Sequence, residues 1–439
     1  MKLAILLATA SLITKAIAFA PFHKYASKST IVLSVAKDTL YEESMPMLYA
    51  SLLAYDFAEV VKAAREREIT LKLPADFPVD LNKFQDESLD FTKVDMNNGN
   101  GLCFSDIMAV IESNKDIFTE LLLDVGDDVI NFNLEVLNNI AKSYNENKAC
   151  LYLSVYRSYY AKVSCVYGIV KDVNKKRIIV AFRGSKSPGT NQDWQANLNS
   201  RLVKMETPAL IQNKLDGDLK KHIYVHDGFH DYLFENNNLA NVQVYDNIVN
   251  DIKPLMEKDY TIYVTGHSLG GSLAHLLSFT LAGKDIDWLP KPITCISYAA
   301  PYSGGSDYRT ANEQLEKDDL LRSLRIFNEN DFIPVFPPIS LNFLPKPMKH
   351  TGINLRLTEE NGYTIGHSSN DGFWNAVNNS FVKLFKKRLF EHGPQAHGDR
   401  LVDNKKELNA VTIDGLYKDK TVVSNDFIEG KTKSSNNKS

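Results

Sequence analysis

The sequence predicts an α/β fold, in which a mostly parallel central sheet is flanked by helices, together with an N-terminal mainly helical region. From about residue 150 onward, short apolar runs alternate with helical patterns, and the run Ile178–Phe182 contains no polar residue. Continuous apolar strands separated by helices are typical of a parallel sheet that is covered on both faces. Earlier in the chain, apolar residues at three- and four-residue spacings predict a helix over about 39–67. The other predicted strands are 152–155, 164–170, 261–264, 293–298 and 324–327.

The first 37 residues have the pattern of a targeting presequence. Lys2 precedes an apolar run that is too short to span a bilayer, and no acidic residue occurs until Asp38. Residues 1–37 are therefore predicted to be a signal or transit presequence that directs the chain into the secretory pathway. The junction 18–21, Ala-Phe-Ala-Pro, resembles the bipartite presequences of algae with secondary plastids, which predicts a secondary plastid as the destination. Simple secretion is the alternative.

Patterning divides the rest of the chain into three parts. Residues 38–148 are the N-terminal mainly helical region, 149–415 the α/β domain and 416–439 a polar C-terminal tail. The segment 95–106 has the composition of a calcium loop, but its glycines miss the position of the sharp turn and Asp106 replaces the bidentate Glu. We interpret this segment as an ordinary Asn/Gly turn, and no metal is predicted.

Composition argues against two kinds of function. The 439 residues are 44% hydrophobic and carry a formal net charge of −4, which allows a sizeable core but gives no broad basic field for nucleic acid. The four cysteines lie far apart and lack C-x-x-C pairing, which argues against a structural zinc site. They are interpreted as core thiols, and a bridge between Cys150 and Cys165 in an oxidising compartment is the alternative.

A β-rich run that ends in a serine between two glycines carries the functional prediction. Residues 261–271 place Ser268 between Gly266 and Gly270, and 272–279 continue as a strongly helical run. This order of strand, sharp turn and helix is typical of a nucleophile elbow, in which a strained turn projects the serine hydroxyl clear of the backbone. Ser268 is therefore the predicted nucleophile. The alternative, a phosphate-binding turn, lacks a following lysine and a G-x-G-x-x-G motif.

A serine nucleophile needs a base that removes its proton, and the base needs a carboxylate that holds its tautomer. The strand-like run 323–327 leads to Asp331, which is the predicted acid, and Glu329 at the same strand exit is the competing carboxylate. In folds with a nucleophile elbow, the acid and then the histidine follow the serine along the chain. The eligible bases are therefore His350, His367, His392 and His397.

Acyl transfer also needs two backbone N–H groups fixed where negative charge develops. One belongs to Leu269, the residue after the nucleophile. The other is assigned to Ser185, because Gly184 permits a tight turn directly after the strand 178–182. These two amides are the predicted oxyanion hole.

Four motifs, in order along the chain, resemble those of the class 3, fungal-type lipases of the α/β-hydrolase superfamily. The resemblance spans roughly residues 150–401, and several spaced motifs in order are more specific than G-x-S-x-G alone. The motifs are 182–185 (FRGS) followed by 193–194 (DW), 225–229 (VHDGF), 265–271 (TGHSLGG) and 330–338 (NDFIPVFPP).

This resemblance implies a role for each matching residue. It gives Ser268 as the nucleophile, Asp331 as the acid, and Ser185 with Leu269 as the oxyanion donors. It also places the family's lid at 186–199, where Pro188, Gly189 and Thr190 lengthen the segment.

The resemblance also selects the base among the eligible histidines. The family's base commonly precedes an aromatic residue and then an Arg-Leu pair. Arg400-Leu401 supplies that pair, which identifies His392 as the general base, and His397, in the place of the aromatic residue, is the alternative base. The chain departs from the family at 299–301, where Ala-Ala-Pro replaces the usual Gly-Ala-Pro.

The function that the resemblance implies is a serine carboxylic-ester hydrolase, which cleaves acyl esters of acylglycerols or polar membrane lipids through an acyl-enzyme and without a cofactor. The expected partner is a lipid substrate at a membrane or droplet interface, and no stable transmembrane anchor is expected. Triacylglycerol, phospholipid and galactolipid hydrolysis would use the same motifs and differ in the shape of the pocket. A catalytically silent member that binds lipid or a protein partner is the alternative.

Overall fold

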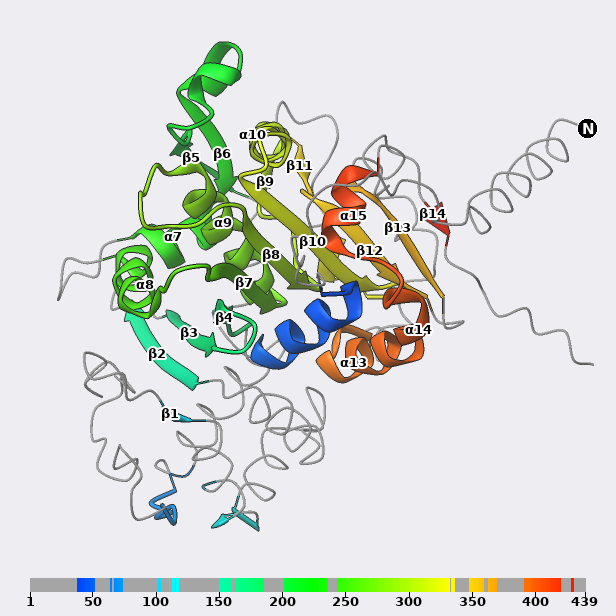
Figure 1. Ribbon diagram of the computed structural model, residues 1–439. Helices are drawn as coiled ribbons and strands as arrows, with labels where there is room; N and C mark the ends of the chain where they lie inside the picture. The colour runs from blue at the N-terminus through cyan, green and yellow to red at the C-terminus, as the bar shows by residue number, and fades with distance from the viewer. Residues whose placement is uncertain are drawn as a thin grey trace, which may run out of the picture. The chain divides into compact units, whose positions relative to one another are not determined.

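A ten-stranded sheet with helices on both faces forms the framework of the protein (Figure 1). The computed structural model describes residues 38–51, 64, 67–73, 102–103, 110, 113–114, 116–117, 150–158, 163–184, 201–235, 243–331, 333–335, 347–358, 362–368, 391–419 and 428–429. The strands of this sheet, in spatial order, are β1 (Leu102–Cys103), β2 (Cys150–Ser158), β3 (Val163–Asp172), β4 (Arg177–Phe182), β7 (Thr261–His267), β8 (Ile293–Tyr298), β10 (Leu321–Asn328), β12 (Ile353–Leu357), β13 (Tyr363–His367) and β14 (Ile428–Glu429).

Helices and a second, smaller sheet complete the described part of the chain. The α-helices are 40–51, α7 (Asp227–Phe234), α8 (Val244–Ile252), α9 (Leu269–Gly283), α10 (Ser306–Lys317), α13 (Pro394–Asp403), α14 (Lys405–Leu408) and α15 (Ile413–Lys418). Short 3-10 turns are η3 (Gln212–Lys214), η4 (Gly217–Lys220), η5 (Lys253–Leu255) and η6 (Ile333–Val335). The second sheet has the order β11-β9-β6-β5 and comprises β5 (Leu202–Glu206), β6 (His222–His226), β9 (Gly304–Gly305) and β11 (Met348–Lys349).

The centre of the large sheet is parallel, as the alternation of apolar strands and helices predicts. Strands β4, β7, β8, β10 and β12 pair in parallel, and each of the six predicted strands lies within an observed one. The outer strands, β1 to β3 on one side and β13 to β14 on the other, pair antiparallel. Only four residues separate β2 from β3, which is too few for a parallel crossover and dictates a hairpin.

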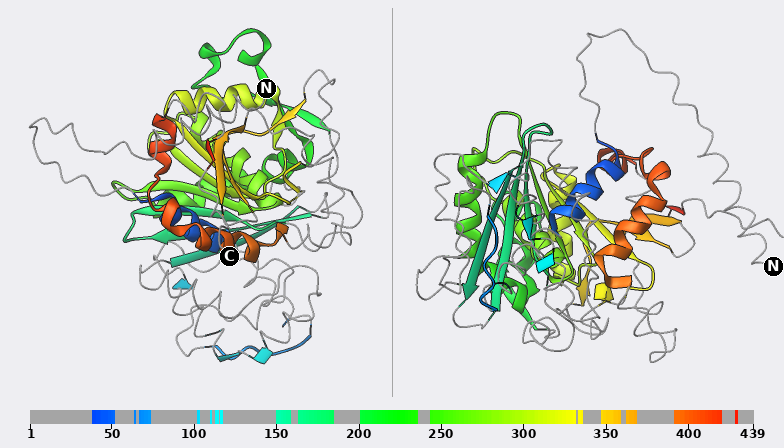
Figure 2. Two further views of the ribbon diagram at one scale, coloured as in Figure 1. Left: turned by 90° about the vertical axis from the view of Figure 1, so that its right-hand side faces the viewer. Right: turned by 90° about the horizontal axis from the view of Figure 1, so that it is seen from below.

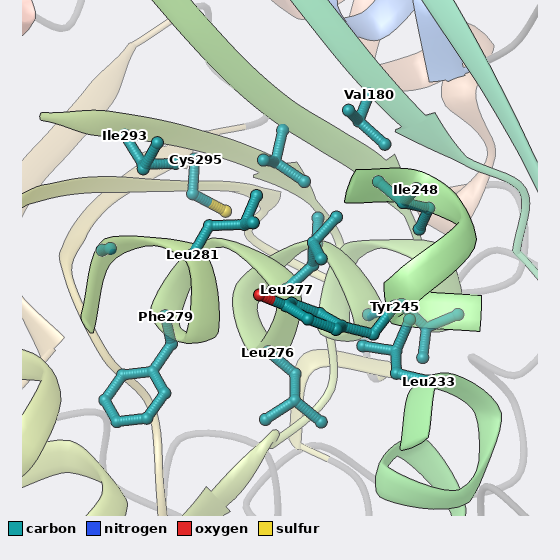
Figure 3. Packing of buried hydrophobic residues seen from close by; sticks show 14 of the residues in the cluster. Val180, Leu233, Tyr245, Ile248, Leu276, Leu277, Phe279, Leu281, Ile293 and Cys295 are labelled. Atoms are coloured by element: carbon teal, nitrogen blue, oxygen red, sulfur yellow. The ribbon is translucent and has the colours of Figure 1, made fainter. Parts of the chain in front are cut away.

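The side chains of β7 alternate between the two faces of the sheet, as the pleat requires. Ile262 and Val264 belong to the main apolar core, which also contains Val180 of β4 and Cys295 of β8. Figure 3 shows how side chains from α8 and α9 fill the space against these strands. Every residue of α9 is buried and none is Asp, Glu, Lys or Arg, so this helix lies in the interior and fixes the strand that precedes it.

The opposite face of β7 is covered by the helix 40–51. Thr265 of β7 donates a hydrogen bond to the carbonyl of Met47 at 3.2 Å, and the Tyr298 hydroxyl of β8 donates to the carbonyl of Ser44. Figures 1 and 2 show this helix beside α13 and α14. The beginning of the predicted helical region therefore packs directly on the sheet, whereas the predicted presequence 1–37 and most of 38–148 lie outside the described residues.

The C-terminal helix α15 continues across the boundary predicted between 415 and 416. Leu416 is buried, and the hydroxyl of Tyr417 accepts a hydrogen bond from the Ser323 amide of β10 at 2.6 Å. Further on, β14 extends the sheet beyond β13. The packing of the large domain therefore reaches at least to residue 418 and includes residues 428–429, which the composition assigned to a polar tail.

Strand register argues against the bridge considered between two cysteines. Cys165 of β3 lies opposite Tyr156, whereas Cys150 of β2 lies opposite Lys171. The two cysteines are therefore separated along the ladder by six residues, or about 20 Å at 3.4 Å per residue, which is too far for a disulfide.

In the described part of the chain, no helix combines the length and the apolar character needed to cross a membrane.

Candidate active site

The serine predicted as nucleophile lies in a sharp turn between β7 and α9. Ser268 follows the last residue of β7 and has φ 56° and ψ −127°, a conformation that L-residues rarely adopt. Its amide donates to the Tyr298 carbonyl of β8 at 2.9 Å, which ties the turn to the neighbouring strand. The strained backbone of this serine is the conformation expected of a nucleophile elbow.

Two glycines make room for this turn. A Cβ atom at Gly266 would lie 2.2 Å from the carbonyl oxygen of Gly270, so any side chain there collides across the turn. A Cβ atom at Gly270 would lie 2.5 Å from the carbonyl oxygen of Phe182 on β4. The first collision occurs inside the turn as expected from the sequence, and the second arises from the close approach of α9 to β4.

The predicted acid leaves the end of β10, two strands away from β7. The carboxylate of Asp331 is fully buried and accepts a hydrogen bond from the Ile333 amide at 3.0 Å. The competing carboxylate, Glu329, instead pairs with Arg356 at 2.6 Å and is one-third exposed. The structure therefore separates the two acidic residues that the sequence places at one strand exit.

The imidazole of His392 lies between the acid and the serine. Its Nδ1 is 2.9 Å from Oδ2 of Asp331, and its Nε2 is 2.9 Å from Oγ of Ser268. With Nδ1–H donated to the carboxylate, Nε2 is the acceptor for the serine hydroxyl. The three side chains thus form one hydrogen-bonded chain that can draw a proton from Ser268.

The other eligible histidines lie elsewhere. His350 stacks on Tyr302 with ring centroids 3.9 Å apart, and Nε2 of His367 is 3.7 Å from a carboxylate oxygen of Glu316. His397 is fully buried in α13, where its Nδ1 lies 3.0 Å from the Gly393 carbonyl. Burial lowers the pKa of His397 to about 4, so this ring is neutral at ordinary pH. In the described part of the chain, no hydrogen bond joins any of these three histidines to Ser268.

Two residues without a predicted role, His267 and Asn328, hold the backbone around His392. Nε2 of His267 lies 2.7 Å from the His392 carbonyl oxygen, and Nδ2 of Asn328 donates to the Glu391 carbonyl at 2.8 Å. We call Glu391–His392 the histidine segment. The sequence contains one hint of such a role, because His267 and Asn328 lie close to the predicted nucleophile and acid along the chain. The residues that they contact lie more than 60 positions away, so the sequence does not reveal the contacts.

A buried ion pair holds the same segment from its other side. The Arg400 guanidinium donates to the Glu391 carboxylate at 2.6 Å and to the Leu357 carbonyl at the end of β12 at 2.9 Å. Arg400, the first residue of the Arg-Leu pair that marked the histidine in the sequence, therefore contacts the residue directly before that histidine.

Only part of the predicted oxyanion hole falls within the described residues. Leu269 opens α9, and the first amides of a helix have no partner within the helix, so its N–H is available to an oxyanion. Ser185 and the predicted lid 186–199 lie outside the described residues, which end at Gly184 after β4. Both stay predictions. Among the described residues, no cluster of three or more His, Cys, Asp or Glu side chains is suited to hold a metal ion.

Comparison with known proteins gives the family of this domain. Residues 179–341 match the family model of the class 3 lipases. The chain is 24% identical to phospholipase A1-IIgamma of Arabidopsis thaliana over 53% of its own length and 57% of that protein. It is 30% identical to the chloroplastic galactolipase DONGLE of the same plant over 39% of its length and 36% of that protein. The chain thus spans about half or less of the length of these relatives.

A solved structure of Rhizomucor miehei triacylglyceride lipase is 20% identical, with a TM-score of 0.38 over 55% of this chain and 79% of that one. The fold assignment depends on the chain's own topology: a parallel centre, a strained serine after β7 and a buried helix directly behind it. With the family match over 179–341, these features show that the chain carries a class 3 lipase domain of the α/β-hydrolase fold.

Proposed function

We propose that the protein is a serine carboxylic-ester hydrolase, with Ser268 as nucleophile, His392 as general base and Asp331 as the acid that orients the base. The observation that carries this proposal is the hydrogen-bonded chain from Asp331 through His392 to Ser268, which ends on the strained residue of the elbow. A serine hydroxyl gains nucleophilic strength only when a base accepts its proton, and this geometry supplies that base.

The reaction proceeds in two acyl transfers. Nε2 of His392 takes the proton of Ser268 as Oγ attacks the ester carbonyl carbon, and the oxyanion forms against the amides of Leu269 and Ser185. The protonated imidazole, stabilised by Asp331, then gives its proton to the departing alcohol oxygen, which leaves an acyl-serine. Water, deprotonated by the same nitrogen, attacks this ester, and the carboxylic acid and the free serine are released.

The substrate class that we propose is an acyl ester of a glycerolipid, with polar membrane lipids favoured over triacylglycerol. Support comes from the relatives, whose names are phospholipase A1 and galactolipase. The headgroup pocket decides between these lipids, because a family fold alone does not define a substrate.

A location in a plastid is consistent with this substrate class. Four relatives carry the word chloroplastic in their names, and residues 1–37 have the composition of a presequence. A fluorescent reporter fused to residues 1–40 is expected in a secondary plastid, and the Phe19→Ala fusion in the secretory pathway. Secretion of the unaltered fusion would instead assign a plain signal peptide.

The function is tested by covalent labelling together with lipid profiling. The purified protein is expected to react with a fluorophosphonate and to release fatty acid from one lipid class among triacylglycerol, phosphatidylcholine and monogalactosyldiacylglycerol vesicles. Ser268→Ala should lose the label and lower the rate on the order of a thousandfold or more, because no acyl-enzyme can form. A folded wild-type protein that neither labels nor hydrolyses any of the three lipids would assign the chain to the silent, lipid-binding alternative.

A further inference from the structure

The histidine segment is attached to the two strands that carry the other reacting residues. His267, the last residue of β7, stands directly before Ser268, and its imidazole reaches the carbonyl of His392. Asn328, the last residue of β10, stands three positions before Asp331, and its amide reaches the carbonyl of Glu391. The end of each strand therefore supplies a donor to the backbone of the histidine segment, and a predicted reacting residue, Ser268 or Asp331, follows shortly after it.

The contact of His267 is short and fully enclosed. Its Nε2 lies 2.7 Å from the carbonyl oxygen of His392, and only 3% of the residue is exposed. Since a carbonyl oxygen only accepts, Nε2 carries the proton and donates. Burial, followed by the neighbouring His392 and His397, holds the pKa of His267 well below its usual range. The ring is therefore neutral, and it does not add a second positive charge beside the imidazolium that forms during the reaction.

The contact of Asn328 is equally sheltered. The residue is fully buried, and its Nδ2 donates to the Glu391 carbonyl at 2.8 Å. Because the two donors approach consecutive carbonyl groups from two different strands, they restrain both the position of the histidine segment and its rotation. Such a restraint matters most for a side chain that has to stay within hydrogen-bond distance of two partners at once.

We infer that His267 and Asn328 are positioning residues for the general base: their hydrogen bonds to the backbone of the histidine segment hold the His392 imidazole between Ser268 and Asp331. This inference rests on the proposed function, since it assigns His392 as the base. The physical reason is the sensitivity of proton transfer to geometry, where a misplacement of about 1 Å costs about a hundredfold in rate. Loss of either donor leaves the three reacting groups intact but relaxes their alignment.

The test compares three variants at buried histidines. His267→Leu removes the donor, whereas His267→Gln keeps an amide N–H at about the reach of the lost Nε2. His275→Leu is the control, because His275 is also buried, in α9, and its Nε2 contacts Ser297 at 2.8 Å rather than the histidine segment. For each variant, kcat and KM on a soluble p-nitrophenyl ester are measured per folded molecule, together with the midpoint of thermal unfolding and the rate of fluorophosphonate labelling.

The expected result is a selective loss of kcat. His267→Leu should lower kcat and the labelling rate about 10- to 100-fold with KM nearly unchanged, and His267→Gln should recover kcat to within about threefold of wild type. His275→Leu should lower the unfolding midpoint at least as much while keeping kcat within about threefold. Asn328→Leu should repeat the kcat loss of His267→Leu from the second strand.

Two outcomes overturn the inference. In the first, His267→Leu keeps the wild-type kcat. In the second, His267→Gln and His275→Leu lose kcat as severely as His267→Leu, which makes the effect one of general packing. Either outcome leaves the proposed function standing if wild type hydrolyses the ester and Ser268→Ala does not. An inactive, unlabelled wild type would instead refute the function itself.

Discussion

The two ends of the central strands each contain a buried carboxylate, but the partners differ. At the carboxyl end, the carboxylate of Asp331 is fully buried and contacts the imidazole of His392, whose other nitrogen contacts Ser268. At the opposite end, Asp172 is equally buried and pairs with Arg177 at 3.0 Å, at the start of β4. A guanidinium keeps its charge at every accessible pH, whereas an imidazole can gain and lose a proton.

This difference suits the Asp172 end of the strands to stabilising the fold and the Asp331 end to proton transfer. The Arg177 guanidinium keeps its positive charge opposite Asp172, so this buried pair holds the start of β4 and has no base that could take a proton from a substrate. In the proposed mechanism, the carboxylate of Asp331 faces a charge that forms only when His392 takes a proton, so its effect is expected to be largest in the transition state. Substitutions of the reacting side chains at the carboxyl end should therefore act on kcat, and those of the ion pair at the other end on the free energy of unfolding.

The largest effect is expected from the base itself. His392→Ala should lower kcat on the order of a thousandfold or more, since the proton transfer of this ring has no substitute. His397→Ala should keep kcat within about tenfold, because no hydrogen bond joins that ring to Ser268 among the described residues. Ester hydrolysis at matched folded concentration measures both. The reverse pattern would make His397 the base.

A large effect on stability is expected from the opposite end. Asp172→Asn leaves the Arg177 guanidinium, which is 3% exposed, without its closest carboxylate, and should lower the free energy of unfolding by about 3 kcal/mol with kcat unchanged. Urea unfolding monitored by fluorescence measures the loss. Asp259→Asn is the matched control, because Asp259 pairs with Lys176 at 3.8 Å with both side chains more than half exposed, and should change stability by less than about 1 kcal/mol. Equal losses in the two variants would contradict the distinction.

The helix that covers the sheet adds a dependence of stability on pH. Burial, followed by the negative charge of Asp38, raises the pKa of Glu43 to about 7. A carboxyl with a raised pKa in the folded state binds more protons there than in the unfolded chain, so its contribution is complete below about pH 4.5 and is lost as pH rises toward 7. Glu43→Gln should therefore stabilise the protein by about 2–3 kcal/mol at pH 8 and leave stability near pH 4.5 almost unchanged.

Unfolding by urea at the two pH values measures this difference. The Gln side chain still accepts the hydrogen bond that the Tyr263 hydroxyl gives to Glu43 at 3.3 Å, so the substitution removes the charge and keeps the contact. A stabilisation of the same size at both pH values would show that titration of Glu43 is not its cause.

The smallest effect is expected at a strained residue of the carboxyl end. Ala299, directly after β8, has φ 51°, a conformation that disfavours a side chain, at the position where the resemblance to class 3 lipases leads us to expect glycine. Ala299→Gly should raise the free energy of unfolding by about 0.5–1 kcal/mol. Ala300→Gly is the control, since the methyl group of Ala300 packs close to Gly271 and its loss should lower stability. Thermal unfolding distinguishes the two, and a gain in neither or in both would argue against strain at Ala299.

The sequence predicted those parts of the fold that depend on local pattern. The strands β4, β7 and β8 are rich in apolar residues. A run such as Ile178–Phe182, which has no polar side chain, is stable only where both faces of the sheet are covered. The periodicity before residue 67 predicted a helix, and residues 40–51 form one. Its packing against Thr265 and Tyr298 was not predictable, because more than 200 residues separate the partners and an amphipathic pattern does not say which surface it meets.

The candidate site likewise contains residues that the local pattern predicted and contacts that it did not. Ser268 and Asp331 stand at strand ends that the pattern marks, and the structure brings both within hydrogen-bond distance of His392. The choice between His392 and His397 depended on family resemblance, since the two histidines are only five positions apart and the fold decides which ring faces the elbow. The donors to the histidine segment escaped prediction because their acceptors are backbone carbonyls, which no side-chain pattern records.

The contact between the helix 40–51 and the segment after α14 has a consequence for how the chain is made. The Leu40 amide bonds the Val411 carbonyl, and Thr39 bonds Asn409 across 370 residues of sequence. Synthesis proceeds at about 5–20 residues per second, so the helix 40–51 emerges from the ribosome on the order of 20–70 s before the segment that closes over it. Through that interval, the apolar side chains of Leu40, Met47 and Leu48 have no native cover from the C-terminal helices, and we expect this stretch to be where a chaperone holds the nascent chain.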